Sequence, residues 1–525
     1  MSQAANFHLD SPAVTRDPGR TAMADFPCPY LTPKCAAIAL LAAVLLCWPM
    51  LVTTAPLIYF DTISYYSNGE QIWLRLGRML FAPPPLPGAG TGAGTQAMAS
   101  AAEDAAAASV NLRSLPYAAI FYPSASTPLG LVLTCILQTT VTLWVFIGLA
   151  PPLSAHEKKL AGLGALGVGT LTTLPWFASY AMPDILVAAL PAYYTLGLRR
   201  ADGLGLFQLM ALLAIAIFVI LAHYGHIPLA VGLALCVLAW RTYRRRLTWF
   251  AAVYCLLPII LAVGINMASS AALAAFTSSP AAAEAKDHQQ PGLGGSEAQS
   301  GQVSITPNRL PLMLARSLAD GPGHWYLEQA CSERAVYATC EVFDEIPNTL
   351  SGFLWEETGI KSATPEQLRA IRDEEMEIVL AAARAYPLEQ ALALGENTGL
   401  QIVTVGTGEV LPMPAQDPAT PITELTPRTD DALSKPMIGF FDTITPVATA
   451  LAALMLLGRL VTGRTHPIVT EATIILGLAI LGNALIYGGL SAPVDRYGSR
   501  LVWLVPALLA LDLALRQGRT ARAVA

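Results

Sequence analysis

The stretch CAAIALLAAVLLCWPMLVTTAPL, residues 35–57, contains no charged side chain. An α-helix needs about 20 such residues to cross the roughly 30 Å hydrocarbon core of a bilayer. The run is too long for the apolar part of a signal peptide, and no convincing cleavage site follows it. It therefore predicts a first transmembrane helix that is retained in the mature protein.

The composition of the whole chain favours the same environment. Of 525 residues, 54% are hydrophobic and only 13% are charged, and the mean hydropathy is +0.50. Soluble domains carry about a quarter charged residues. The net charge of −6 is not that of a nucleic-acid-binding surface, and no Gly-rich phosphate loop follows a predicted strand. We therefore expect an all-α polytopic membrane protein whose surroundings are the lipid bilayer, with no nucleic-acid partner.

Ten apolar windows are long enough to predict transmembrane helices. They lie at residues 36–57, 127–150, 159–177, 184–198, 205–222, 227–241, 248–270, 438–458, 468–488 and 500–515. The lysines and arginines between them alternate from one side to the other, with the run RTYRRR at 241–246 on the basic side. By the positive-inside rule both termini are cytoplasmic.

This topology predicts two long external loops. The expected parts are a cytoplasmic N-terminal segment at 1–35, a transmembrane module at 36–270 with its first external loop at 58–126, an external region at 271–437, C-terminal transmembrane helices at 438–515 and a cytoplasmic tail at 516–525. The Ala-rich, Lys-poor composition is typical of a high-GC bacterium. The membrane is then the inner (plasma) membrane, and the external loops lie in the periplasm.

The external loops contain predicted helices, flexible tracts and one cysteine pair. The first loop begins with an amphipathic segment at 65–80 and continues into a tract rich in Pro, Gly and Ala. The second begins with a linker at 277–307 and includes a helix at 365–385 with Thr364 as its N-cap. Cys331 and Cys340 are the only two external cysteines, which predicts a disulfide in an oxidising compartment.

Unusual polar residues collect near the external face of the predicted spans. They are Asp61, Glu70, Asp184, His223, His226, Arg496, Tyr497 and Arg500. These residues also have structural explanations. Asp184 is stabilised by the dipole of the helix in whose first turn it lies, the histidines are interfacial, and Arg500 extends to the membrane surface. However, ionisable groups gathered at one membrane depth are costly unless they are paired or used. Their shared position predicts a single site.

These residue types suit a substrate that carries a lipid-borne phosphate. A guanidinium group presents a fork of donors that fits phosphate oxygens. A carboxylate acts as a general base on an acceptor hydroxyl. Alternatively, Asp61 and Asp184 together hold a divalent cation such as Mg²⁺ or Mn²⁺ through their oxygens.

The order of these features resembles the GT-C fold of membrane glycosyltransferases. Asp61 lies in the first external loop just after the first helix, with Glu70 in the amphipathic segment behind it, and Asp184 lies in a second external loop. The segment DRYGSRLVWLVPAL at 495–508 is similar to the Arg-Tyr segment that leads into a late helix of such enzymes. The motif YFDTIS lacks the family's adjacent acidic pair, and the second loop has no Asp-x-Asp.

The resemblance implies transfer from a polyprenyl-phosphate- or polyprenyl-diphosphate-linked sugar to a saccharide, lipid or protein acceptor at the periplasmic face. It implies that Asp61 is the base or the acid that orients the acceptor, and that Asp184 is the second acid, for the acceptor or a metal. It also implies that Arg496 or Arg500 binds the donor phosphate. Glu70, His223, His226 and Tyr497 complete the expected substrate-binding set.

Two other functions fit parts of the same pattern. One is a transporter or flippase for a lipid-linked saccharide, which requires polar residues in the middle of the spans. The other is an enzyme like the O-antigen ligases and polysaccharide polymerases, which use external Arg and His residues. His223 and His226 support this second alternative.

Overall fold

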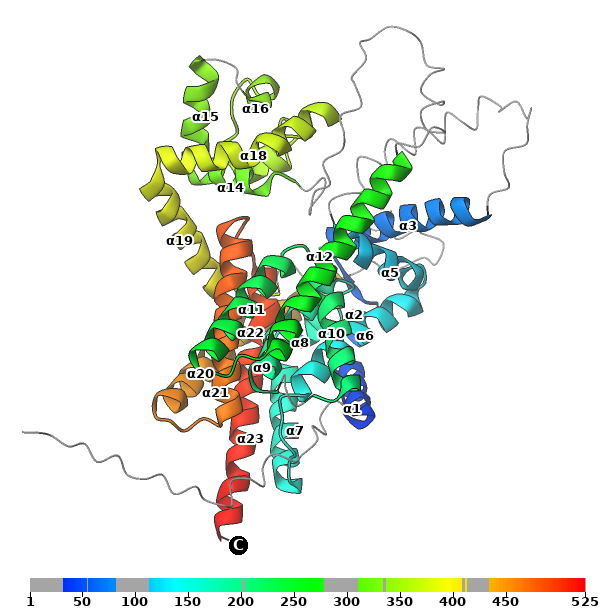
Figure 1. Cartoon of the computed structure of the whole chain (residues 1–525), viewed down its shortest axis with the longest axis vertical. Coiled ribbons are helices and arrows are strands. Elements are labelled where there is room, and N and C mark those ends of the chain that lie inside the picture. The colour runs from blue at the N-terminus through cyan, green and yellow to red at the C-terminus, as the bar shows by residue number, and fades with distance from the viewer. Residues whose placement is uncertain are drawn as a thin grey trace, which may run out of the picture.

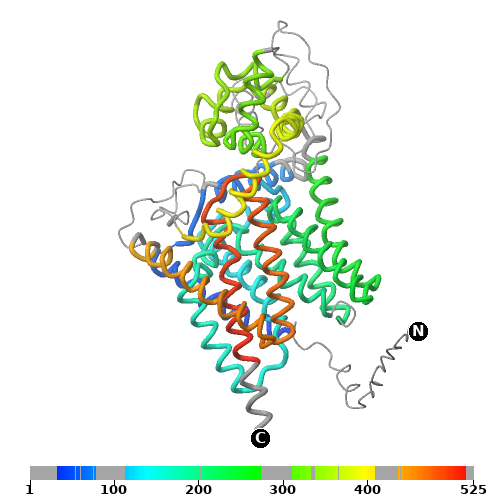
Figure 2. The backbone as a smooth tube through the Cα atoms, turned by 90° about the vertical axis from the view of Figure 1, so that its left-hand side faces the viewer, coloured from blue at the N-terminus to red at the C-terminus, as the bar shows by residue number. Residues whose placement is uncertain are grey.

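The computed structural model describes residues 32–53, 55–81, 113–200, 204–277, 310–333, 337–407, 411–412 and 434–524. The N-terminal segment up to residue 31, the Pro/Gly/Ala-rich tract at 82–112 and most of the linker predicted at 277–307 lie outside these ranges. The described chain is almost entirely helical, and most of its long helices run along the long axis of the molecule (Figures 1 and 2).

Within the described ranges, seven helical stretches are long and apolar enough to cross a membrane. They are Pro33–Thr53, Pro128–Ile147, His226–Tyr243, Trp249–Ala272, Gly439–Val461, Pro467–Gly489 and Asp495–Leu515. Leucines and isoleucines on many of these helices are exposed, as expected of side chains that face lipid. The chain is therefore a multi-pass, mainly α-helical membrane protein.

These stretches contain the following elements. They are α1 (Pro33–Leu46) with α2 (Pro49–Thr53), α6 (Pro128–Ile147), α11 (His226–Tyr243), α12 (Trp249–Thr277), α20 (Ser434–Val461), α21 (Pro467–Asn483) with the π-helix η6 (Ala484–Gly489), and α22 (Asp495–Val502) with α23 (Leu504–Val524). Helix starts follow capping chemistry: at α6 the Thr127 hydroxyl accepts a hydrogen bond from Gly130 N at 3.1 Å, and Pro128 occupies the first helical position.

The prediction of ten spans is not confirmed. The window at 159–177 is divided between α7 (Ala155–Leu171) and the short α8 (Leu174–Ala178). The window at 184–198 is divided between the 3₁₀-helix η3 (Pro183–Ala188) and α9 (Ala189–Arg200), and the window at 205–222 is α10 (Leu206–Ala222). At 1.5 Å per residue, the 17 residues of α7 or α10 reach about 25 Å, which is short of a full hydrocarbon core.

The chain after the first span forms two helices that pack on each other. The strand β1 (Leu57–Ile58) pairs with β2 (Leu411–Pro412), and Leu57 also bonds to Ser179 and Ala181. The following helix α3 (Phe60–Phe81) contains the amphipathic segment predicted at 65–80 but begins earlier, so that Asp61 lies in its first turn. It packs on α5 (Leu115–Ala125), where the Tyr65 and Tyr117 rings are 4.8 Å apart.

A group of short helices forms a separate hydrophobic core at one end of the molecule (Figure 1). The group consists of α14 (Leu312–Asp320), α15 (Pro322–Glu333), α16 (Ala338–Val342), α17 (Leu350–Leu354) and α18 (Pro365–Ala385). The helix predicted at 365–385 is confirmed, with Thr364 and Gln367 forming a capping box. From this group α19 (Pro387–Val403) returns to the spans and contacts η6. The region predicted to be external thus contains a small folded unit of its own.

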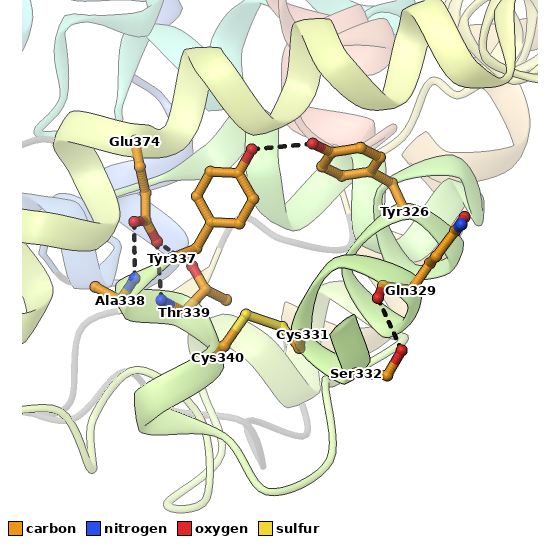
Figure 3. The surroundings of a disulfide bond; sticks show 9 residues. All are labelled: Tyr326, Gln329, Cys331, Ser332, Tyr337, Ala338, Thr339, Cys340 and Glu374. Carbon is orange, nitrogen blue, oxygen red and sulfur yellow. Dashed lines mark hydrogen bonds between the residues drawn. A yellow bond between two sulfur atoms is a disulfide. The ribbon is translucent and has the colours of Figure 1, made fainter. Parts of the chain in front are cut away.

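The predicted disulfide is present in this unit. Cys331 at the end of α15 and Cys340 in α16 are bonded, with their Cα atoms 5.4 Å apart (Figure 3). Beside it the carboxylate of Glu374 accepts hydrogen bonds from the backbone N–H groups of Ala338 and Thr339, both at 2.8 Å. The disulfide and Glu374 together hold α16 against α15 and α18.

Candidate functional site

Four elements from distant parts of the sequence meet at the end of the spans that faces α14–α18. They are the first turn of α3, the first turn of η3, the start of α22, and the junction of α21 with η6. The start of α3 is brought to η3 because Leu57 in β1 bonds to the chain just before η3. Five ionisable side chains gather here, and we refer to them as the charge cluster: Asp61, Arg113, Asp184, Arg496 and Arg500.

Arg496 lies between the two acids that the sequence predicted to be catalytic. Its Nη1 atom is 3.3 Å from Asp61 Oδ2, and its Nε atom is 3.9 Å from Asp184 Oδ1. All three side chains are buried, with 2–8% of their surfaces exposed. The guanidinium also lies over the ring of Tyr59, 4.4 Å from its centre. One arginine therefore links both carboxylates in a site shielded from solvent.

Arg500 forms a second, deeper contact with Asp184. Its Nη1 atom donates to Asp184 Oδ1 at 3.1 Å, and its Nη2 atom donates to Asn483 Oδ1 at 2.8 Å. The side chain of Arg500 is completely buried, so it does not extend to the membrane surface. Asp184 Oδ2 and Arg500 Nε are buried and have no hydrogen-bond partner among the described residues. A buried polar atom without a partner is costly, so these two atoms are unusual among the described residues.

Arg113 is a member of the cluster that the sequence did not indicate. It lies just before α5, donates to Asp61 and forms an ion pair with it. Burial by itself raises the pKa of Asp61, but the charges of Arg113 and Arg496 outweigh burial and hold that pKa below its ordinary value. Asp61 is therefore ionised at neutral pH.

The two predicted histidines lie beside the cluster. His223 Nδ1 is 3.0 Å from the hydroxyl of Tyr487, and the Tyr487 ring stacks on Arg500 with 4.0 Å between the guanidinium carbon and the ring centre. Gly225 permits this contact, because a Cβ atom there would overlap the Tyr487 hydroxyl. Burial, together with neighbouring His226 and Arg500, lowers the pKa of His223 well below its ordinary value. His223 is therefore neutral at physiological pH.

His226 and Tyr497 also lie beside the charge cluster, whereas Glu70 lies away from it. His226 is fully buried and its Nδ1 atom is 2.7 Å from the Val219 carbonyl. The Tyr497 hydroxyl accepts a hydrogen bond from Arg496 Nη2 at 3.3 Å. Glu70 follows Asp61 by nine residues on α3, and at about 100° per residue this places it on the opposite side of the helix. The structure thus brings together every predicted site residue except Glu70.

The balance of charge in the cluster does not suit a divalent cation. Three guanidinium groups, those of Arg113, Arg496 and Arg500, face only two carboxylates. Three of the four carboxylate oxygens that would hold Mg²⁺ or Mn²⁺ already face these cations, and a further dication would be repelled. In the described part of the chain, no group of three or more His, Cys, Asp or Glu side chains is placed to hold a metal ion. The net positive charge suits an anion instead.

The fold and the cluster define a multi-pass membrane protein with a largely buried polar site, in which three guanidinium groups face two carboxylates, at one end of its spans. No protein-family model, curated protein or solved structure matches the chain. The inference about function therefore depends on the geometry of the site.

Proposed function

We propose that the protein is a GT-C-like membrane glycosyltransferase. It moves a sugar from a polyprenyl-phosphate- or polyprenyl-diphosphate-linked donor to an acceptor hydroxyl at the periplasmic face of a bacterial inner membrane. The observation that carries the proposal is the excess of guanidinium groups at one end of the spans, where the buried Arg496 and Arg500 and the partly exposed Arg113 face only two carboxylates. A positive excess in a largely buried site is costly unless an anion compensates it, and a lipid-linked phosphate is an anion that reaches this depth.

The chemistry assigns the two arginines and Asp61 complementary roles. Arg496 and Arg500 bind the donor phosphate through their planar forks of N–H groups. Asp61 accepts the proton of the acceptor hydroxyl while that oxygen bonds to the anomeric carbon of the sugar. The bond between this carbon and the phosphate oxygen breaks, and its electron pair leaves with the lipid phosphate. The arginines stabilise the negative charge on this leaving group.

In this scheme Arg496 contacts both Asp61 and the donor phosphate, so donor binding changes the pKa of Asp61. In the absence of donor, the charges of Arg496 and Arg113 lower the pKa of Asp61. A phosphate bound to Arg496 compensates part of this positive charge, and the carboxylate then becomes a stronger base. Asp61 is thereby activated when the donor is in place.

Asp184 acts as a positioning residue in this scheme. Its Oδ1 atom is 3.1 Å from Arg500 Nη1 and 3.9 Å from Arg496 Nε. A carboxylate in this position keeps both guanidinium groups in fixed orientations. Its second oxygen, which has no hydrogen-bond partner in the described structure, is free to accept from a hydroxyl of the sugar.

A second candidate is an enzyme like the O-antigen ligases and polysaccharide polymerases. The specific observation in its favour is that His223 contacts Tyr487, whose ring stacks on Arg500. A neutral histidine at this position can hydrogen-bond a hydroxyl of a saccharide acceptor. This candidate uses the same donor chemistry but yields chains of repeating units.

The test uses the full-length protein in lipid nanodiscs and liposomes with polyprenyl-phosphate- and polyprenyl-diphosphate-linked sugars labelled in the sugar. Transfer of the label to one acceptor molecule, with release of the lipid phosphate, supports the glycosyltransferase. A ladder of products supports the polymerase. Movement of intact donor across liposomes without a covalent product identifies a flippase and contradicts both enzymes.

A further inference from the structure

A cavity of about 850 Å³ lies at the end of the spans opposite the charge cluster. Its polar lining comes from Arg199 at the end of α9, from Arg241, Arg244 and Arg246 around the end of α11, and from Glu471 in α21. Two parts of the candidate site show that the charge cluster lies at the opposite end of the same helices. Asp184 is at the start of the η3–α9 pair, whereas Arg199 is at its end, and the η6 junction is at the end of α21, whereas Glu471 is near its start. We refer to this space as the arginine cavity.

The turn after α11 fixes the walls of the arginine cavity. Arg245 has a positive φ of 54°, a conformation that commonly ends helices. Arg246 N then donates to the Arg241 carbonyl at 2.8 Å. The buried Arg241 guanidinium donates to the carbonyls of Gly197 at 3.1 Å and Leu198 at 3.0 Å, which ties the end of α11 to the end of α9.

The arginine cavity carries an excess of positive charge. Arg199 forms an ion pair with Glu471, the single acidic residue among the described residues of the lining. Arg241 is directed at backbone carbonyls, whereas the side chains of Arg244 and Arg246 are exposed. Four guanidinium groups thus share a cavity with one carboxylate, and a phosphate group compensates this excess.

Aromatic side chains place the arginine cavity at the depth of lipid headgroups. Tyr243 and Trp249, on either side of the turn, are 78% and 67% exposed, and Trp240 in the cavity lining is 42% exposed. Exposed Trp and Tyr are enriched at membrane–water interfaces. The guanidinium carbon of Arg244 lies 5.0 Å from the centre of the Trp240 ring, so this arginine is held at the same level.

We propose that the arginine cavity binds the phosphate headgroup of an anionic phospholipid. Basic pockets between transmembrane helices on the cytoplasmic side recognise such headgroups, and this is the end that the arginine distribution predicts to be cytoplasmic. The site is separate from the charge cluster. The proposal does not depend on the glycosyltransferase function.

The test measures lipid binding by the full-length protein. The wild type and the R244Q/R246Q double variant are transferred to phosphatidylcholine nanodiscs that contain increasing fractions of phosphatidylglycerol. Retained phosphatidylglycerol is counted by native mass spectrometry, and thermal unfolding is followed in parallel. Because both side chains are exposed, the variant is expected to fold, and its melting temperature in pure phosphatidylcholine verifies this. A matched control, K158Q/K159Q, removes two exposed charges on α7, which the topology places at the same end of the spans.

We expect R244Q/R246Q to weaken phosphatidylglycerol binding by roughly 30-fold, and K158Q/K159Q to leave it within about twofold of wild type. Equal losses in the two variants would overturn the proposal, because they would indicate general surface charge. Unchanged binding in R244Q/R246Q would also overturn it. Inorganic phosphate is added to pure phosphatidylcholine nanodiscs as a third arm. If phosphate stabilises the wild type in these nanodiscs, the ligand of the arginine cavity is a free anion and not a lipid, and the proposal is overturned.

Discussion

Arg496 Nη1 lies 3.3 Å from Asp61 Oδ2, so the start of the last membrane-crossing stretch is joined directly to the helix that follows the first. Both side chains are buried, and Arg113 approaches the same carboxylate from a third part of the chain. The two ends of the transmembrane part are therefore held together at the candidate site. Changes to this contact are expected to affect activity and folding in different ways.

Replacement of Asp61 by Asn should reduce sugar transfer by about 10²–10⁴-fold, because the amide cannot accept the acceptor's proton. The measurement is label transfer from the lipid-linked donor, with circular dichroism and melting temperature as checks on folding. E70Q is the matched control, since it makes the same chemical change on the same helix but away from the charge cluster. Transfer by D61N at the wild-type rate would exclude Asp61 as the base.

Replacement of Arg500 by Ala should destabilise the protein by about 3–5 kcal/mol, because it removes the nearest counter-charge of the buried Asp184. Thermal unfolding in detergent measures the loss, and R464A, at an exposed position outside the cluster, is the control. The double variant D184N/R500Q should lose less stability than the sum of its single variants, since it leaves no unpaired charge. Strict additivity would show that the two side chains are not coupled.

The contribution of Asp61 to stability should persist at neutral pH and disappear in acid. The pKa of Asp61 is lower in the folded protein than its ordinary value of about 3.9. The stabilisation is therefore fully present above about pH 4 and decreases as the pH falls through the folded-state pKa. The difference in melting temperature between wild type and D61N should be constant from pH 7 to pH 5 and shrink below about pH 4. A difference that declines between pH 7 and pH 5 would contradict the ion pairs.

Removal of the disulfide with C331S/C340S should destabilise the unit formed by α14–α18 by about 2–3 kcal/mol, as expected for closing a short loop. Limited proteolysis of the full chain should cleave this unit faster and leave the membrane part intact. In the wild type, alkylation after reduction should label two more cysteines than alkylation before reduction, and the variant should show no such difference. An equal count in the wild type would mean that the bond does not form in the cell.

The general plan of the protein was predictable from sequence because it depends on local properties. The length of the apolar run at 35–57 and the capping sequence at Thr364 act within a few helical turns, and the structure contains both helices. The number of spans was less predictable. Helix length near residues 172 and 184 depends on where the chain breaks into short and 3₁₀ helices.

The candidate site was predictable in part, for a related reason. Asp61, Asp184, Arg496 and Arg500 are rare charges at the ends of apolar runs, so their unusual position is visible in the sequence. Arg113 follows a Pro/Gly/Ala-rich tract, and no local pattern distinguishes it from a solvated arginine. Glu70 resembles Asp61 in sequence, but the rotation of α3 directs it away.

Apolar length and charge spacing are properties of short segments, so they predict from sequence that the chain crosses a membrane repeatedly and that charged residues gather near the ends of the spans. Which of these charges meet depends on the fold. The bonds of Leu57 to the chain before η3 bring Asp61 to Asp184, and the close approach of Tyr487 to Gly225 brings His223 to Arg500. Such contacts depend on packing between distant segments, which no local pattern encodes.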